Sequence, residues 1–160
     1  MPVALPPRPP DDADLGFQPH PARLDDPLDD VGDQPLHVGR GNDRGGNNIR
    51  VNFFGEIRKL HSVWDDGIIE HQKLSFSEMT RFLQLELAGK VEVGDGGVES
   101  WAQESMDYRG QLYEIWGRTS RDNYLPELGW VYVYDHLGTV KRRLYLAGLR
   151  LAGVLNSIYD

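Results

Sequence analysis

Residues 56–70 read EIRKLHSVWDDGIIE, and this stretch decides the fold class. Its apolar side chains recur every three to four residues, which is the spacing of one face of an α-helix. They are Ile57, Leu60, Trp64 and Ile68. The spacing therefore predicts a helix over residues 56–70.

Further along the chain, three more stretches carry helical patterns. Ser75 and Glu78 have the spacing of a capping box ahead of an apolar run that stops at Gly89. Apolar residues at helical spacing also predict helices over 98–117 and 136–157.

The segments between these helices are predicted to be loops. Residues 34–55 are rich in glycine, and Val131-Tyr132-Val133-Tyr134 has no visible partner strand, so it is assigned to a loop or to the first turn of the last helix. The fold class predicted from periodicity is all-α, with long loops.

On the last predicted helix an apolar stripe runs through Val140, Leu144 and Ala147 to Leu151, Val154 and Leu155. Four basic residues fall largely off this stripe, namely Lys141, Arg142, Arg143 and Arg150. The run Lys141-Arg142-Arg143 is predicted to be a solvated face.

Composition divides the chain into a tail and a body. Residues 1–33 contain eight aspartates against two arginines, and nine of the 10 prolines lie at or before Pro35. A proline- and aspartate-rich segment with few large apolar side chains is predicted to be disordered. We therefore divide the chain into a tail over 1–33 and a folded body over 34–160.

Several classes of protein are excluded by composition. The chain has no cysteine, so it has neither disulfides nor thiolate metal sites. No apolar run approaches the ~20 residues of a membrane span, and the N-terminus as written has no signal-peptide pattern. The body holds 17 acids against 15 bases, which predicts weak non-specific binding to nucleic acid.

The first candidate site residues are His61 and Asp65. Residues four apart on a helix lie on one face, so these two side chains could meet one zinc ion at ~2.1 Å. The alternative is an exposed His–Asp pair without a metal.

A second candidate segment lies upstream, where His37 precedes a loop that reads DRGGN over 43–47. A histidine on such a loop could supply a third ligand, and its glycines would let the backbone approach a phosphate.

Together the motifs resemble those of the S1/P1 nuclease family, in the same order along the chain. They read QPLH at 34–37, DRGGN at 43–47, LHSVWD at 60–65, W-x-x-E-S at 101–105 and AGLRLAGVLN at 147–156. The resemblance implies an all-α helical bundle of the phospholipase C/P1 nuclease type. It covers the C-terminal portion of that fold, so the bundle is expected to be incomplete.

The resemblance also implies an activity. Members of this family are zinc-dependent endonucleases that cut single-stranded DNA and RNA to 5′-phosphate products, and they act as 3′-nucleotidases. They hold three zinc ions in one cleft, a close pair and a third, more exposed ion. Nucleic acids and nucleotides are the implied partners, without a membrane or a protein partner.

By that resemblance His37, His61 and Asp65 match the three protein ligands of the exposed zinc ion. Two histidines and one carboxylate leave positions open for water or a substrate phosphate. Asn47 matches a position that lines the nucleotide site, and Arg44 stands where a base-stacking residue occurs in some relatives. We expect both to contact substrate.

Asp33 would be the carboxylate that bridges the close zinc pair, and so a catalytic residue. Compared with the family pattern, two residues are missing between Asp33 and Gln34. On a helix, this deletion would rotate Asp33 by ~200° relative to His37. Asp29 replaces a zinc-binding histidine. We therefore expect one of the three zinc sites to survive in this chain.

The N-terminal part of the family pattern has no counterpart in residues 1–28, which predicts a truncated or frame-shifted N-terminus. Two alternatives to an active nuclease stay open: an inactive helical fragment that keeps one zinc site, and a relative of zinc phospholipase C. The resemblance implies a secreted or periplasmic location.

Overall fold

The computed structural model describes residues 33–39, 41–94, 96–115 and 125–159. Of the predicted tail (1–33), only Asp33 falls within these residues. The described chain is mostly helical, as predicted. Its main helices are α3 (Phe76–Leu87), α4 (Val98–Leu112) and α5 (Trp130–Tyr159).

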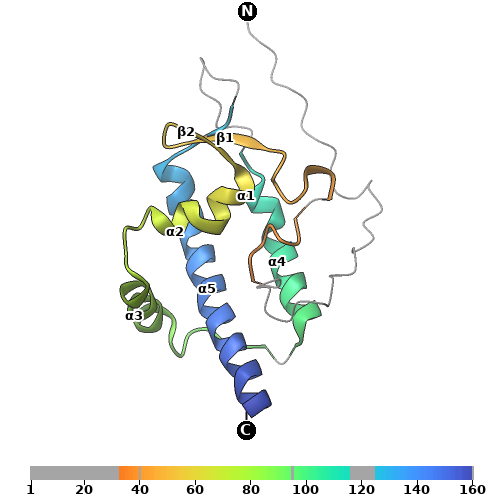
Figure 1. Ribbon diagram of the computed structural model, residues 1–160, viewed down its shortest axis with the longest axis vertical. Coiled ribbons are helices and arrows are strands. Elements are labelled where there is room, and N and C mark those ends of the chain that lie inside the picture. The colour runs from red at the N-terminus through yellow and green to blue at the C-terminus, as the bar shows by residue number, and fades with distance from the viewer. Residues whose placement is uncertain (1–32, 40, 95, 116–124, 160) are drawn as a thin grey trace, which may run out of the picture.

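The long helix α5 runs down the centre of the molecule, with α4 on one side and α3 on the other (Figure 1). The segment Val131-Tyr132-Val133-Tyr134 forms the first turn of α5, as the sequence allowed. The capping box before α3 is also present, because the Ser75 hydroxyl accepts from the Glu78 N–H while the Glu78 carboxylate accepts from the Ser75 N–H.

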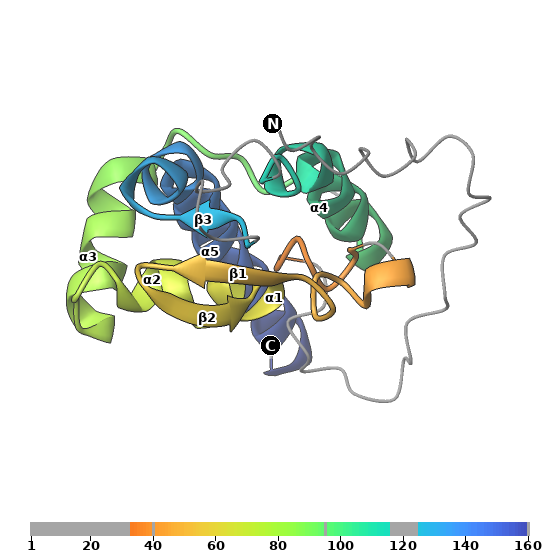
Figure 2. The same ribbon diagram turned by 90° about the horizontal axis from the view of Figure 1, so that it is seen from above.

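A small three-stranded sheet corrects the prediction for residues 50–59. Strand β1 (Arg50–Phe53) pairs antiparallel with β2 (Glu56–Lys59), and β3 (Glu127–Leu128) lies parallel on the other side of β1 (Figure 2). The predicted helix from residue 56 was therefore wrong in its first four residues. Ile57, counted in the helical stripe, is on a strand and 60% exposed.

The hairpin between β1 and β2 turns on two residues with left-handed backbone, Phe54 (φ 50°) and Gly55 (φ 90°). Positive φ at both central residues is the requirement of the tightest β-hairpin turns, whose twist matches that of the strands. Glycine meets this requirement without strain, whereas Phe54 is an unusual occupant. The hairpin brings the chain back to start a helix at Leu60.

Residues 60–70 then form one continuous helical segment. It consists of α1 (Leu60–Ser62), a π-helical turn over Val63–Gly67 and α2 (Ile68–Glu70). A π-helical turn inside a helix is rare and is often found at functional sites. Leu60, Val63 and Ile68 from this segment are fully buried.

A chain of hydrogen bonds crosses the core and joins three helical segments. The Trp64 indole N–H donates to the Tyr132 hydroxyl at 2.8 Å, and that hydroxyl donates to the Leu112 carbonyl at 3.2 Å. Apolar side chains from β1, β3, the helical segment 60–70, α5 and the loops beside them pack around it. They are Leu36, Val51, Phe53, Leu60, Val63, Ile68, Tyr113, Ile115, Leu128, Val133 and Val140.

A buried ion cluster corrects the prediction for the basic residues of α5. Arg143 and Arg150 are each only 3% exposed, although Arg143 was predicted to lie on a solvated face and Arg150 to lie off the apolar stripe. Both guanidinium groups contact the Asp33 carboxylate, Arg143 at 2.8 Å and Arg150 at 2.5 Å, and both bind Glu104 on α4. We call Asp33, Glu104, Arg143 and Arg150 the ion cluster.

Further contacts anchor Arg143 in the ion cluster. Its Nε donates to the Asp33 carbonyl at 3.1 Å, and its Nη2 donates to the Ser105 hydroxyl at 2.7 Å and to the Trp101 carbonyl at 3.1 Å. The guanidinium of Arg150 lies 5.0 Å from the centre of the Trp101 ring. Paired in this way, two cations can be buried, which unpaired charges could not be.

The ion cluster changes the acidity of Glu104. Partial burial by itself would raise the pKa of this carboxyl, but hydrogen bonds to Arg150 and Arg143 and their positive charge outweigh burial and hold the pKa below its ordinary value of 4.5.

Among the described residues, no helix has the length and apolar content needed to cross a bilayer.

Replacing Tyr132 with phenylalanine should destabilise the fold by about 1–3 kcal/mol, because Trp64 Nε1 and the Leu112 carbonyl would lose a buried partner. Urea unfolding measures this free energy. Tyr134→Phe is the control, since Tyr134 follows two residues later on α5 and is 85% exposed. Equal effects of the two substitutions would contradict the buried hydrogen-bond chain.

Glu104→Gln should lower the free energy of unfolding at pH 7 by about 1 kcal/mol, a low value for a charged hydrogen bond because this carboxylate is 35% exposed. A lowered pKa stabilises the fold above pH 4.5, and this contribution is lost as the pH falls through the folded-state pKa. The difference between wild type and variant should therefore shrink on acidification.

Urea midpoints measured across pH 3–7 test this expectation. Glu114→Gln is a suitable control because Glu114 is an exposed residue just after α4. A difference between wild type and Glu104→Gln that is constant with pH would contradict an ionised Glu104 in the ion cluster.

Candidate metal centre

The loop that carries His37 is anchored to the core from both sides. Asp33 is held by the ion cluster, and Leu36 is only 1% exposed. Turn hydrogen bonds from the His37 N–H to the Gln34 carbonyl (3.1 Å) and from the Gly39 N–H to the Leu36 carbonyl (3.0 Å) shape the loop between them. This anchoring leaves the His37 side chain at the surface, 36% exposed.

Three predicted ligands, His37, His61 and Asp65, meet at this loop. One ligand atom from each lies within 4.8 Å of the others. His61 Nε2 is 3.4 Å from Asp65 Oδ2, and His37 Nε2 is 3.8 Å from Asp65 Oδ1. The two imidazole rings are stacked with centroids 5.4 Å apart.

The 3.4 Å between His61 Nε2 and Asp65 Oδ2 fits a zinc ion. Two ligands at bond lengths near 2.1 Å and a tetrahedral angle lie about 3.4 Å apart. Two imidazoles and one carboxylate are the donor types found in open zinc sites, where further positions are left for water or substrate. The side chains are partly exposed, 18% for His61 and 41% for Asp65, so an ion could reach them.

The tautomer of His61 suits this role. Its Nδ1 lies 2.7 Å from the Gly45 carbonyl oxygen. Since a carbonyl oxygen only accepts, Nδ1 carries the proton and Nε2 keeps its lone pair, directed toward Asp65. Metal-binding histidines are commonly oriented by such a hydrogen bond from the second ring nitrogen.

Gly45 is required by the backbone at this point. It has a φ of 62°, and a Cβ atom there would lie 2.3 Å from the Leu36 carbonyl oxygen. The next residue, Gly46, has a φ of 81°, and its N–H donates to Asp43 Oδ1 at 2.8 Å. These two glycines let the loop approach His61 closely.

Asn47 and Arg44, the predicted substrate contacts, lie on the same loop. The Asn47 side-chain amide donates to the Arg44 carbonyl at 3.1 Å, so it braces the turn. Arg44 is exposed and has a left-handed φ of 57°. Both residues therefore flank the glycines beside His61, and their contact with substrate stays a prediction.

Asp33, the predicted bridging and catalytic carboxylate, lies outside the cluster of three ligands. Its Oδ1 is bound by Arg143 and Arg150, and it is 6% exposed. Its metal role stays a prediction of the resemblance.

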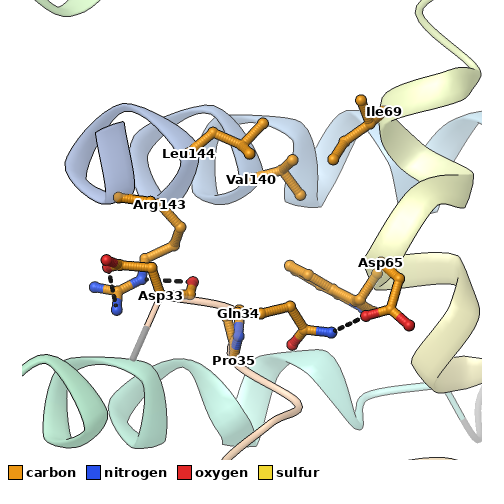
Figure 3. Close-up of a pocket in the computed structure, with 10 residues that line it drawn as sticks. Asp33, Gln34, Pro35, Asp65, Ile69, Val140, Arg143 and Leu144 are labelled. Atoms are coloured by element: carbon orange, nitrogen blue, oxygen red, sulfur yellow. Dashed lines mark hydrogen bonds and ion pairs between the residues drawn. The ribbon is translucent and has the colours of Figure 1, made fainter. Parts of the chain in front are cut away.

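A pocket separates Asp33 from Asp65 (Figure 3). Val140 and Leu144 of α5 and Ile69 of α2 line one side, and Gln34 lies on the other, between the two carboxylates. Pro35, Trp64, Arg143 and Ala147 complete the lining. The candidate metal centre thus borders a largely apolar hollow.

Sequence reasoning missed two supporting residues. Gln34 donates to Asp65 Oδ1 at 2.6 Å, and Asp43 accepts from Gly46 and from the Tyr113 hydroxyl at 3.2 Å. Gln34 belongs to the QPLH motif and lies three residues before the ligand His37. This position in the motif could have indicated its role. The contact of Asp43 with Tyr113 spans 70 residues, so no local pattern points to it.

Comparison with known proteins agrees with these motifs. The sequence profile described as S1/P1 Nuclease matches residues 29–160. Endonuclease 3, Endonuclease 5 and Endonuclease 4 of Arabidopsis thaliana are 35%, 33% and 31% identical to this chain. The aligned segments cover 79%, 79% and 81% of it.

The same segments cover 47%, 47% and 48% of the three plant proteins, so the chain spans about half the length of these curated relatives. The family match nevertheless includes all three residues of the candidate metal centre and the whole described structure. From this match, and from the order of its motifs, the chain belongs to the S1/P1 nuclease family.

Proposed function

We propose that His37, His61 and Asp65 bind one zinc ion that serves the hydrolysis of phosphodiester bonds in single-stranded DNA or RNA. The products would carry 5′-phosphates, and a complete domain would also act as a 3′-nucleotidase. One observation carries the proposal: the approach of three zinc-type ligand atoms to within 4.8 Å of one another.

Family membership supports the reaction class, since the plant relatives are named endonucleases. The chain spans about half of their length, so the activity of the whole protein and its substrates are inferred from the family. The family also supports a secreted or periplasmic location.

Zinc and the chain's own residues would have separate roles at this site. Zinc, when bound, would supply positive charge that stabilises the charge developing on the phosphate. The Gly45 carbonyl holds His61 in the tautomer that presents Nε2. Asn47 would hydrogen-bond the substrate, and the Arg44 guanidinium could stack on a base.

Asp33 would have to leave its arginines to act as a bridging carboxylate. Its Oδ1 accepts from two guanidinium groups in the described arrangement. This observation favours a second candidate function, a helical module that binds one zinc ion and does not cleave nucleic acid.

Zinc content measured by mass spectrometry of the desalted protein should be near one ion per chain. His61→Ala and Asp65→Asn should both lower it to near zero, because each removes a ligand. Asp66→Asn is a matched control, since Asp66 lies beside Asp65 on the same π-helical turn but pairs with Arg58. Equal loss from Asp65→Asn and Asp66→Asn would contradict the assigned ligands.

Cleavage of a single-stranded DNA oligonucleotide tests the reaction. The proposal predicts zinc-dependent release of fragments with 5′-phosphate ends, lowered more than about 100-fold by Asp65→Asn and unchanged by Asp66→Asn. One bound zinc ion without cleavage would favour the second candidate function. Phosphatidylcholine vesicles provide the substrate control for a phospholipase.

A further inference from the structure

We propose that Gln34 is a positioning residue that keeps Asp65 a one-oxygen ligand of the metal. By holding Oδ1, Gln34 directs Oδ2 to the ion and leaves a coordination position open for a phosphate oxygen. This inference rests on the proposed metal site and adds a residue that sets its coordination.

The orientation of the Gln34 amide is fixed by the backbone. Its Oε1 accepts from the N–H of Leu36 and from the N–H of His37, the latter at 3.3 Å. An amide nitrogen could not accept these bonds, so Nε2 must face Asp65. Nε2 donates to Asp65 Oδ1 at 2.6 Å.

The two oxygens of Asp65 therefore have different surroundings. Oδ1 carries the Gln34 bond and lies 3.8 Å from His37 Nε2, whereas Oδ2 lies 3.4 Å from His61 Nε2, the nitrogen available to a metal. A carboxylate with one oxygen occupied in this way binds an ion through the other oxygen more readily than through both. Removing the amide would free Oδ1 to join the ion and fill the position meant for substrate.

Gln34 is itself held in place. The carbonyl and carboxylate of the preceding residue, Asp33, are bound by buried Arg143. The following residue is Pro35, which restricts the backbone of Gln34 to extended conformations. Figure 3 shows the Gln34 side chain reaching across from this loop to Asp65.

Gln34→Leu and Gln103→Leu form a matched pair for the test. Gln103 on α4 also donates its amide to a carboxylate, Asp107 Oδ1 at 3.0 Å, on an exposed surface. Each chain is loaded with Co²⁺ as a spectroscopic probe of the site. The affinity of each chain for Co²⁺ and the visible absorption of the bound Co²⁺ are measured. Inorganic phosphate is then added stepwise, and the change in that absorption is followed.

We expect wild type and Gln103→Leu to bind Co²⁺ equally and to give the same phosphate-induced spectral change. Gln34→Leu should bind Co²⁺ with roughly 10-fold altered affinity and respond to phosphate at least 10-fold more weakly, in line with the effects of other supporting residues. Wild-type spectra and phosphate response in Gln34→Leu would overturn the inference.

Gln34→Glu tests whether the effect of Gln34→Leu comes only from a disrupted loop. Its carboxylate can still accept from the Leu36 and His37 N–H groups, but it has no donor for Asp65. A folded Gln34→Glu chain should show the weakened phosphate response, and a normal response would overturn the proposal. A wild-type chain that binds no Co²⁺ would overturn the metal site itself, which separates the two failures.

Discussion

Two buried guanidinium groups set the constraint on which the rest of the structure depends. Arg143 and Arg150 lie two helical turns apart on α5 and are almost fully buried, so each must find anions within the protein. They find Glu104 on α4 and Asp33 at the start of the loop that carries His37. Because Asp33 is fixed, the loop that follows it must run past the helical segment 60–70. Charge pairing in the interior thereby determines where a surface histidine meets its partners.

Local patterns predicted the parts of the fold that depend on local spacing. The His61–Asp65 pair follows from the repeat of a helix, and the π-helical turn that begins between them still leaves the two side chains 3.4 Å apart. The Ser75–Glu78 capping box was equally readable, because both of its hydrogen bonds lie within four residues. His37 needed more than spacing, and only the order of several motifs placed it with the other ligands.

Features made by distant segments could not be read in this way. Strands β1 and β2 have four residues each, too few for alternation to outweigh the helical spacing that includes Ile57. The partner of β1 on its other side, β3, lies more than 70 residues along the chain. Arg143 was assigned to solvent because a single helix cannot show that acidic groups from two other segments will cover it. The bond from Gln34 to Asp65 spans 31 residues and depends on that same arrangement.

The ligands of the candidate metal centre come from two segments that the chain joins only through the glycine loop and the hairpin. An ion held by His37 and His61 would cross-link these two segments in the folded state and would be released on unfolding, so its binding free energy would add to the free energy of unfolding. Metal affinity and folding would then be thermodynamically linked, with the bound ion raising the melting temperature as its concentration rises. The intervening β-hairpin, enclosed within the cross-linked segment, would gain protection of its backbone amides against hydrogen exchange.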